Sequence, residues 1–392
     1  AAPDVVICPE ATRFELNSEK KREVKLLAMS KILDCRLIAT NLTGCEAGGD
    51  IYDGMCLIAQ KGELVARSNL LSFRDGDIFT DKDGICEYLN EYDTCVRAVA
   101  LGLYDWMKKT RSKGFALSLS GGADSALCAV SVFYSQLAAL DELGFAEYRS
   151  TLESLGFSVP DYNGENPQEY IKSAIMPQIL TTVYQYSDVS GKVTREAASE
   201  VAHAIGASHF EWSIASLVST YTELVNATTP DQPLSWDTDD LALQNIQARS
   251  RAPGIWMIAN RYNKLLIATC NASEDAVGYC TMDGDTAGGI APIGDLSKSR
   301  VLRINEHIAS EGLYVSLGRL KLECPQMSFV TAQAPTAELR PGGQQTDERD
   351  LMPYVILDRI HELHQLSLKT PQFILDTLCS EYPDFNREKF SD

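Results

Sequence analysis

A short polar run holds the residues best suited to chemistry: Ser120, Gly121, Gly122, Ala123, Asp124 and Ser125. The apolar stretch 115–119 precedes this run, and a helical pattern begins at about Asp124. Adjacent glycines let the backbone approach an anion closely, and the start of a helix directs free N–H groups and a positive dipole at it. The Asp124 carboxylate would repel phosphate unless a Mg²⁺ ion bridged the two. The run therefore predicts a phosphate-binding turn; the alternative is an ordinary glycine-rich turn with an Asp at the helix start.

The elements around this run predict an α/β fold. A strand, a turn and a helix in that order are typical of a doubly wound, mostly parallel sheet. Helical and strand patterns then alternate, over 196–206, 209–214, 244–263 and 264–270. Residues 138–172 have the pattern of a polar, mostly helical insertion, residues 278–297 that of a glycine-containing loop region, and the tail from Asp350 is helical.

The same patterning divides the chain into three parts. Residues 1–75 form a first α/β unit, residues 76–110 a linker and a helix, and residues 111–392 the main domain. The predicted elements of the first unit are two buried strands with a helix between them, then a hairpin: 4–8, 18–33, 36–42 and 55–67. Lys61 and Gly62 are the expected hairpin turn.

Composition limits the possible partners and location. Asp and Glu number 54 against 35 Lys and Arg, a net charge of −19, so we expect no binding to nucleic acid, which needs a basic face. The most apolar stretch, 125–140, is too short to span a membrane, so we expect no membrane partner. Eleven cysteines without a CxxC pair are typical of reduced thiols. The first ten residues lack the basic segment of a signal peptide, and we therefore expect a cytoplasmic protein.

Residues 120–125 resemble the SGGxDS pyrophosphate loop of the N-type ATP pyrophosphatases, which include NAD, GMP and asparagine synthetases. Three more segments are similar, in order and spacing, to motifs of glutamine-dependent NAD synthetases: 243–251, 268–299 and 334–348. The motifs are an N-x-x-A-R helix, a T-x-N-x-S-E strand end, a glycine loop with a following Lys, and a P-[ST]-A-[ED]-L segment. The resemblance implies the adenine nucleotide alpha hydrolase-like fold and an ATP-consuming ligase.

The resemblance also implies an ATP site with Mg²⁺. The residues it assigns to ATP are Ser120, Gly121, Gly122, Asp124, Ser125, Thr269, Lys298 and Thr336. Asp124 and Glu274 would hold Mg²⁺. Asp124 and Lys298 would be catalytic, because a lysine charge can follow the shift of charge as pyrophosphate leaves. Each assignment has an ordinary alternative: a helix-start charge for Glu274, a surface position for Lys298, and strand or cap positions for the two threonines.

A second nucleotide, deamido-NAD, is implied with its own residues: Asn245, Arg249, Glu274, Tyr279 and Asp285. Asn245 and Arg249 are four positions apart and share one helical face, and we expect Arg251 to be a surface neighbour. In the implied reaction, the nicotinate carboxylate attacks the α-phosphorus of ATP, pyrophosphate leaves, and ammonia converts the acyl-adenylate to NAD and AMP. The family is usually at least dimeric, so we expect a homo-oligomer.

Residues 3–75 resemble the C-terminal part of a nitrilase-type glutaminase domain, which glutamine-dependent NAD synthetases carry ahead of the synthetase. We expect an N-terminally truncated remnant in which Cys8 is structural. This chain would then use free ammonia, and a full-length parent would use glutamine. The alternatives are another N-type ATP pyrophosphatase, such as a GMP synthetase, or a non-catalytic scaffold that retains a nucleotide-binding fold.

Overall fold

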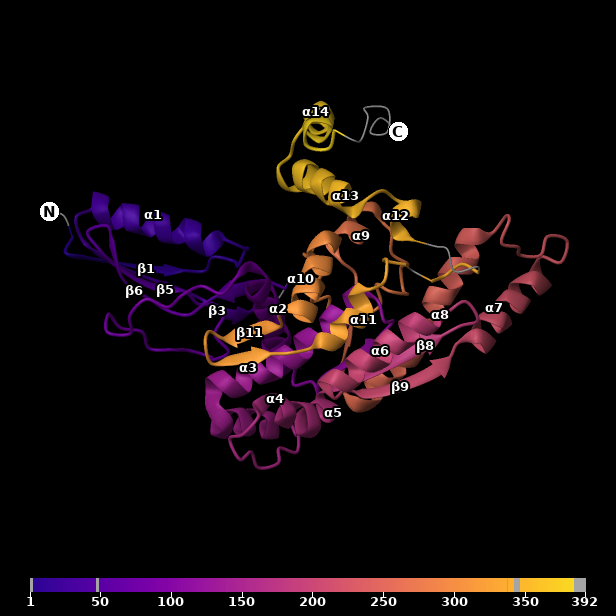
Figure 1. Cartoon of the computed structure of the whole chain (residues 1–392), viewed down its shortest axis with the longest axis horizontal. Helices are drawn as coiled ribbons and strands as arrows, with labels where there is room; N and C mark the ends of the chain where they lie inside the picture. The colour runs from indigo at the N-terminus through magenta and orange to yellow at the C-terminus, as the bar shows by residue number, and fades with distance from the viewer. Residues whose placement is uncertain (1–2, 47–48, 337, 342–345, 384–392) are drawn as a thin grey trace.

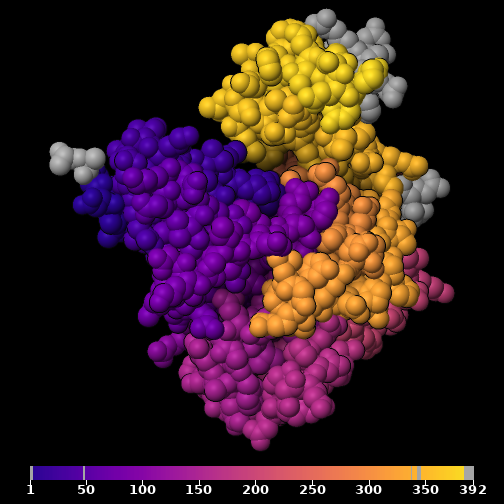
Figure 2. Space-filling view, turned by 60° about the vertical axis from the view of Figure 1, so that its left-hand side comes forward, coloured from indigo at the N-terminus to yellow at the C-terminus, as the bar shows by residue number. Residues whose placement is uncertain are grey.

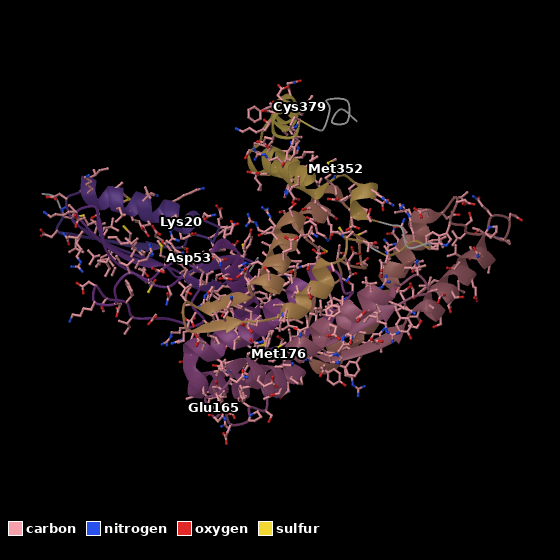
Figure 3. All side chains as sticks on the ribbon, in the orientation of Figure 1. Lys20, Asp53, Glu165, Met176, Met352 and Cys379 are labelled. Atoms are coloured by element: carbon pink, nitrogen blue, oxygen red, sulfur yellow. The ribbon has the colours of Figure 1, made fainter. Side chains whose placement is uncertain are left out.

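The computed structural model describes residues 3–46, 49–336, 338–341 and 346–383. An N-terminal unit, in indigo, lies beside a larger domain, and the last helices form a lobe that stands above both (Figure 1). The space-filling view in Figure 2 shows the same lobe, in yellow, rising from the orange surface of the main domain. Figure 3 places Cys379 in this lobe and Glu165 at the opposite end of the molecule.

A four-stranded parallel sheet forms the centre of the main domain, in the order β10-β7-β8-β9. Its strands are β10 (Leu265–Ile267), β7 (Phe115–Ser118), β8 (Leu180–Tyr186) and β9 (Ser208–Ser213). The chain passes from β7 to β8 on one side and returns to β10 on the other side of β7. The carboxyl end of β7 is therefore a topological switch point, where open α/β sheets bind ligands.

Helices cover both faces of this sheet. Phe115 and Leu117 of β7 point into the main core, which also contains residues of α2 (Glu91–Thr110), α3 (Ala123–Ser154), α6 (Lys192–Ile205) and α10 (Lys298–Ser310). Ala116, between them, faces the opposite side and packs with Ile255 and Ala259 of α8 (Asp240–Tyr262). This alternation with a period of two places one layer of helices on each face. The predicted doubly wound α/β fold is confirmed.

The segment 138–172 is helical, as predicted, but much of it is not polar surface. Helix α3 continues to Ser154 through a break at Gly144, and Tyr148 and Leu152 are fully buried in the main core. Short helical pieces follow: α4 (Pro167–Tyr170), a π-helix (Ile171–Ile175) and α5 (Met176–Ile179). Its status as an insertion stays a prediction.

Helix α3 also bears on the membrane expectation. Its 32 residues make it the one helix in the described part of the chain that is long and apolar enough to cross a membrane, so the apolar stretch is longer than we expected. However, 89% of its most apolar window is buried inside the protein. Packing in the core accounts for the apolar composition of this helix.

The N-terminal unit contains a mixed sheet in the order β1-β2-β5-β6, covered by α1 (Ser18–Ile32). Its strands are β1 (Val5–Glu10), β2 (Arg36–Asn41), β5 (Cys56–Gln60) and β6 (Glu63–Arg67). The β5–β6 hairpin turns at Lys61 and Gly62, both with positive φ, as a tight two-residue turn requires. The expectation that β1 is buried is wrong, because β1 is an edge strand and Ile7 is 68% exposed. Asp53, labelled in Figure 3, is buried at the end of β4 (Ile51–Asp53), which pairs with β3 (Thr43–Cys45).

Helix α2 connects the two units. Asp105 of α2 accepts a hydrogen bond from the Cys45 amide over 2.8 Å. On the same helix, the buried Arg97 donates to Glu142 of α3 over 2.6 Å and to the carbonyl oxygen of Val315 in β11 (Leu313–Ser316) over 3.1 Å. Because these polar groups are buried and paired, α2 fixes the N-terminal unit against the main domain.

The remaining elements lie along the chain between those already named or form the C-terminal lobe. They are α7 (Ala215–Thr228), α9 (Ala272–Val277), β12 (Leu320–Leu322), a 3₁₀-helix (Pro325–Met327), α11 (Ser328–Thr331), α12 (Asp347–Asp350), α13 (Tyr354–His361), a second π-helix (Glu362–Leu366) and α14 (Pro371–Glu381). The predicted helical character of the tail after Asp350 is confirmed up to Glu381.

Candidate active site

A cavity of about 360 Å³ opens at the carboxyl ends of β7, β8 and β10. Ser118, Gln185 and Thr269 mark the three strand ends on its wall, and residues 120–124 form one side of it. This is the switch point of the sheet, so the fold places the predicted phosphate-binding turn where α/β proteins bind ligands.

The turn has the backbone shape that its glycines allow. Gly121 has φ +82°, and a Cβ atom there would lie 2.0 Å from the carbonyl oxygen of Thr194, so no larger residue fits. Helix α3 begins immediately afterwards, at Ala123. Among the described residues, no acceptor faces the amides of Ala123 and Asp124, and these remain available to an anion.

Two other amides of the turn are already used. The Ser120 amide donates to Ser125 Oγ and the Gly122 amide donates to Ser120 Oγ, each over 3.2 Å. The expected free amides at the helix start are therefore present at Ala123 and Asp124, whereas the Gly122 amide already has an acceptor. The acceptors are hydroxyl groups on rotatable side chains, so a phosphate could replace them at these two amides.

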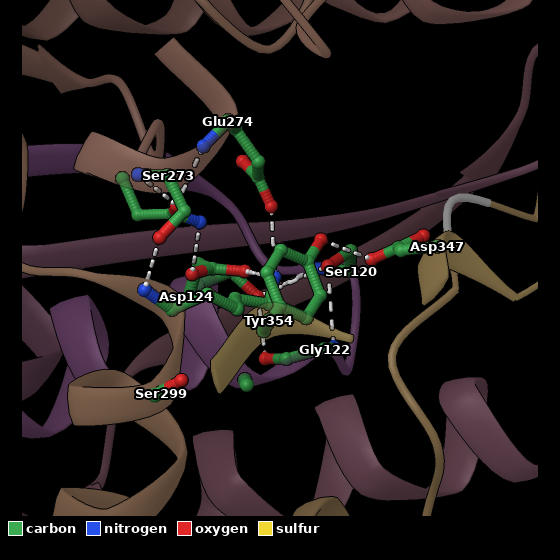
Figure 4. A network of polar contacts seen from close by, with 12 residues as sticks. Ser120, Gly122, Asp124, Ser273, Glu274, Ser299, Asp347 and Tyr354 are labelled. Carbon is green, nitrogen blue, oxygen red and sulfur yellow. Dashed lines mark hydrogen bonds and ion pairs between the residues drawn. The ribbon is translucent and has the colours of Figure 1, made fainter. Parts of the chain in front are cut away.

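Three predicted residues meet beside the turn. The Lys298 ammonium lies 2.5 Å from Asp124 Oδ2 and 2.8 Å from Glu274 Oε1, and the lysine side chain is only 4% exposed. Figure 4 shows the Asp124 and Glu274 side chains converging on this point. The surface alternative for Lys298 is therefore wrong. Glu274 does lie in the first turn of α9, but its carboxylate is also aimed into the cavity.

Burial and charge shift the ionisation of this cluster. Burial and the neighbouring Asp124 carboxylate raise the pKa of Glu274 to about 7, although Lys298 opposes the shift. Burial disfavours the charged form of Lys298, but the Asp124 and Glu274 carboxylates outweigh it and hold the pKa of the lysine above its usual value. The ammonium therefore stays charged while Glu274 titrates near neutral pH.

Sequence reasoning missed the residues that hold this cluster in place. Asn271 caps α9, because its Oδ1 accepts from the amides of Ser273 and Glu274, and its Nδ2 donates to Asp124 Oδ1 over 3.0 Å. Asp358 of α13 accepts from the Ser273 hydroxyl and, over 3.0 Å, from the Ser299 amide at the start of α10. An Asn before the helical run S-E-D could have been recognised as an N-cap. No local pattern indicates Asp358.

The C-terminal segment contributes two more polar groups. Asp347 is 4% exposed and lines the cavity, and its Oδ2 accepts from the Tyr354 hydroxyl over 3.0 Å. The other carboxylate oxygen, Oδ1, is buried and has no partner among the described residues. The Lys298 ammonium lies 5.6 Å from the centre of the Tyr354 ring. Figure 4 shows Tyr354 between Glu274 and Asp347. Burial raises the pKa of Asp347.

Most of the remaining predicted residues also line the cavity: Thr269, Tyr279, Asp285 and Thr336. Asp285 accepts from the Thr281 amide over 2.9 Å, and burial raises the pKa of its carboxyl group. The Tyr279 hydroxyl donates to Asp350 over 2.9 Å, which connects this wall to α12.

Asn245 and Arg249 are not part of the cavity wall. Asn245 accepts from the Thr281 hydroxyl over 3.0 Å, and the exposed Arg249 donates to the carbonyl oxygen of Met282 over 3.0 Å. Both therefore support the 278–297 loop from the outer side. Two positions from Arg249, Arg251 turns to a different face of α8, and it lines the cavity instead of the surface, which corrects our expectation.

Arg251 is a partly buried cation that has no ion pair with a described carboxylate. Its Nε donates to the carbonyl oxygen of Gln185 and its Nη1 to that of Gln247, each over 3.2 Å. Within the described residues no carboxylate lies at ion-pair distance from it, and burial lowers its pKa. A partly buried guanidinium that faces a cavity is suited to an anionic or oxygen-rich ligand.

The donor set is suited to Mg²⁺ only together with a phosphate ligand. In the described part of the chain no group of three or more His, Cys, Asp and Glu side chains is placed to hold a metal ion. Asp124 and Glu274 provide two carboxylates beside the phosphate-binding turn. Mg²⁺ is commonly held by one or two carboxylates, with water and substrate phosphates completing its shell, so these residues fit the ion.

Comparison with known families agrees with this site. A family model described as NAD synthase matches residues 95–381. The chain belongs to the NAD synthase family. The match includes the glycine turn, Lys298, and α13 with Asp358.

The individual proteins to which the chain is similar include glutamine-dependent NAD(+) synthetases. A glutamine-dependent NAD(+) synthetase of Thermotoga maritima is 31% identical over 268 residues, which is 68% of this chain and 37% of that protein. One from Oryza sativa subsp. indica is 28% identical over 409 residues, with coverage of 87% and 54%. The chain spans about half the length of the curated relatives it matches, or less.

Solved structures extend the likeness to the fold of the whole chain. The glutamine-dependent NAD(+) synthetase of Cytophaga hutchinsonii has a TM-score of 0.82 and 35% identity, and the alignment covers 99% of this chain and 61% of that one. The Acinetobacter baumannii enzyme, solved with ADP, has a TM-score of 0.63 at 20% identity and supports the fold alone.

Proposed function

We propose that this chain catalyses the ATP-dependent amidation of deamido-NAD to NAD, with AMP and pyrophosphate as the other products. One observation carries the proposal. A glycine turn at the start of α3 shares a cavity with Lys298, whose ammonium lies within 2.8 Å of two carboxylates. This combination is suited to holding a triphosphate and a divalent cation while charge moves between phosphates.

The phosphate end of ATP would lie against the glycine turn. The amides of Ala123 and Asp124 and the hydroxyls of Ser120 and Ser125 would donate to phosphate oxygens. Asp124 and Glu274 would hold Mg²⁺, which neutralises charge on the phosphates when it is bound. Thr269 and Thr336, both on the cavity wall, would add hydroxyl contacts.

The nucleoside end of ATP would lie deeper, over the sheet. There the cavity wall is apolar and is formed by Val183, Ala252, Ile255 and Leu266, which suits a flat adenine ring. Arg251 lies at the border between this wall and the polar part of the cavity. We propose that its guanidinium contacts ribose or α-phosphate oxygen atoms, a role that the sequence assigned to no residue.

Deamido-NAD would bind on the side of the 278–297 loop. Tyr279 and Asp285 face the cavity, while Asn245 and Arg249 lie on the outer face of α8, next to α7. Helix α7 projects from the domain beside α8 (Figure 1). It exposes an apolar stripe of Leu217, Tyr221, Leu224 and Val225, whose spacing places them on one face.

The stripe supports the expected homo-oligomer. We propose that α7 and α8 pack against a second copy of the chain, which would bury the apolar face and close the outer deamido-NAD contacts. Size-exclusion chromatography with light scattering tests this directly. Replacement of Leu224 by Asp should convert a dimer to monomers and weaken deamido-NAD binding, and a wild-type monomer would contradict the proposal.

In the proposed reaction, a nicotinate carboxylate oxygen attacks the α-phosphorus, and the bond from that phosphorus to the β-phosphate bridging oxygen breaks. Pyrophosphate leaves with that electron pair. Ammonia then attacks the acyl carbon, AMP leaves, and the nitrogen loses a proton to solvent. Lys298 would neutralise the departing phosphates. The site itself would take ammonia, and in a longer protein a glutaminase unit would supply it, as the names of the relatives indicate.

The deciding experiment measures pyrophosphate, AMP and NAD with ATP, Mg²⁺ and ammonium chloride. We expect products with deamido-NAD and none with xanthosine monophosphate. Products with xanthosine monophosphate would instead indicate a GMP synthetase-like enzyme. No products in either mixture would favour the non-catalytic scaffold. A parallel reaction with glutamine in place of ammonium tests the nitrogen donor. Asp124→Ala should abolish product formation and leave the circular dichroism spectrum unchanged.

The proposal also covers the location of the protein and the class of molecule that it binds. The net charge of −19 and the eleven cysteines, which are all free, support a cytoplasmic enzyme that acts on small molecules and not on nucleic acid. Fractionation of cells that express the tagged protein would test this location.

A further inference from the structure

The ammonium of Lys298 lies between the two carboxylates that the proposed function assigns to Mg²⁺. We propose that Lys298 acts as an internal counter-ion that keeps the divalent cation out until nucleotide binds, so that metal and ATP enter together. This inference rests on the proposed function, because it concerns the assembly of the same site. It gives the lysine a role before the reaction, in addition to its contact with phosphate.

The ammonium already lies between these two carboxylates. The ammonium is 2.5 Å from Asp124 Oδ2 and 2.8 Å from Glu274 Oε1, so it takes one oxygen of each group. Asn271 holds the other Asp124 oxygen over 3.0 Å. A divalent ion would therefore meet two Asp124 oxygens that each already accept a hydrogen bond, and the positive charge of the ammonium beside it in a buried site would repel it strongly.

Only the lysine side chain has to move when the site fills. Its backbone amide donates to Ser273 Oγ over 2.8 Å, and the next amide, of Ser299, donates to Asp358 over 3.0 Å. These bonds fix the start of α10, whereas the four-carbon side chain can turn about its own bonds. The movement needs no change in the backbone.

The charge balance favours exchange when a nucleotide arrives. Asp124 and Glu274 bring two carboxylates against a single ammonium, the Asp347 carboxylate also attracts it, and one buried Asp347 oxygen has no partner among the described residues. Phosphate oxygens at the glycine turn would offer Lys298 a new anionic partner beside Asp124. The ion carried by the nucleotide could then take the two released carboxylates.

The test measures Mn²⁺ binding to the whole chain without nucleotide, by electron paramagnetic resonance. We expect no site of micromolar affinity in the wild type, and Lys298→Met should bind one Mn²⁺ about 10-fold or more tightly than the wild type does. Lys298→Arg keeps the charge and should resemble the wild type. Lys25→Met, which removes an exposed lysine of α1, is the matched control and should also resemble it.

Two further measurements make the result decisive. Glu274→Gln added to Lys298→Met should remove the gained site, and the non-hydrolysable analogue α,β-methylene-ATP should induce Mn²⁺ binding in the wild type. Tight binding of Mn²⁺ to the wild type without nucleotide would overturn the proposal, whether or not the variant folds. A folded Lys298→Met variant that binds Mn²⁺ no more tightly than the wild type would also overturn it. Neither readout needs turnover, so failure to form NAD would count against the proposed function and not against this inference.

Discussion

The backbone amide of Ser299 donates to Asp358 Oδ2 over 3.0 Å, so a side chain of the C-terminal lobe fixes the start of the helix that carries Lys298. Asp358 also accepts from the hydroxyl of Ser273, beside Glu274 in α9. One carboxylate thus holds two of the elements that bring charged groups into the cavity, although Asp358 does not line the cavity itself.

Asp358→Asn should therefore misplace Lys298 and Glu274 without removing either. Because the amide retains only one acceptor oxygen for its two donors, we expect kcat to fall about 10-fold while the KM for deamido-NAD changes little. Steady-state kinetics measure both. Arg359→Gln, at the next position but facing Glu381 and Glu362, is the matched control. Equal losses in the two variants would indicate that α13 acts only through stability.

Gly121→Ala tests the shape of the phosphate-binding turn. At φ +82° the new methyl group would lie 2.0 Å from the Thr194 carbonyl oxygen, so we expect the free energy of unfolding to fall by about 2 kcal/mol or more. At Gly122 the added methyl group would meet only Ser120 Oγ, at 3.3 Å, so Gly122→Ala should be much milder. Urea denaturation of both variants gives the comparison, and equal losses would contradict the described turn.

Arg251 and Arg249 form a natural pair for testing which arginine faces ATP. Arg251 lines the cavity, and Arg249 is exposed on the outer side of α8. We expect Arg251→Leu to raise the KM for ATP about 10-fold, since a charged hydrogen bond to ligand is lost, and Arg249→Leu to leave it unchanged. Initial rates at varied ATP measure this. A raised KM for ATP in Arg249→Leu and an unchanged one in Arg251→Leu would indicate that Arg251 has only a structural role.

Glu274 should make stability depend on pH. Its pKa is raised from 4.5 to about 7 in the folded chain, so the folded state binds more protons than the unfolded state between these values. Stability from this group is therefore present below pH 4.5 and is lost as pH rises through 7. Relative to Glu274→Gln, the wild type should lose about 1–3 kcal/mol of unfolding free energy between pH 5 and pH 8.

Urea denaturation without added metal at several pH values measures this difference. Asp285→Asn serves as a comparison, because Asp285 also lines the cavity but has no ion pair with Lys298 among the described residues. A difference between wild type and Glu274→Gln that does not vary with pH would show that Glu274 ionises normally in the folded chain.

The sequence by itself was sufficient for features that depend on neighbouring residues. The strand–turn–helix at 115–125, the hairpin at Lys61 and Gly62, and the helices α1 and α2 all lie where patterning predicted them. Glycine conformations, hydrophobic periods and helix ends are decided by a few adjacent residues, so these features can be predicted from the sequence alone. The motifs also identified the family to which the chain belongs.

Only the tertiary structure decided which charged groups meet. Asp124 and Lys298 are 174 positions apart, and their contact depends on the packing of α10 against α3 and α13. Helical periodicity separates Arg249 from Arg251 but does not say which faces the cavity. Asp347 and Asp358 belong to no recognised charge pattern, and the sequence of β1 does not indicate that one face of the strand, which includes Ile7, is exposed. Such contacts arise from the arrangement of distant elements, whose free energy is shared over the whole core and is encoded in no single segment.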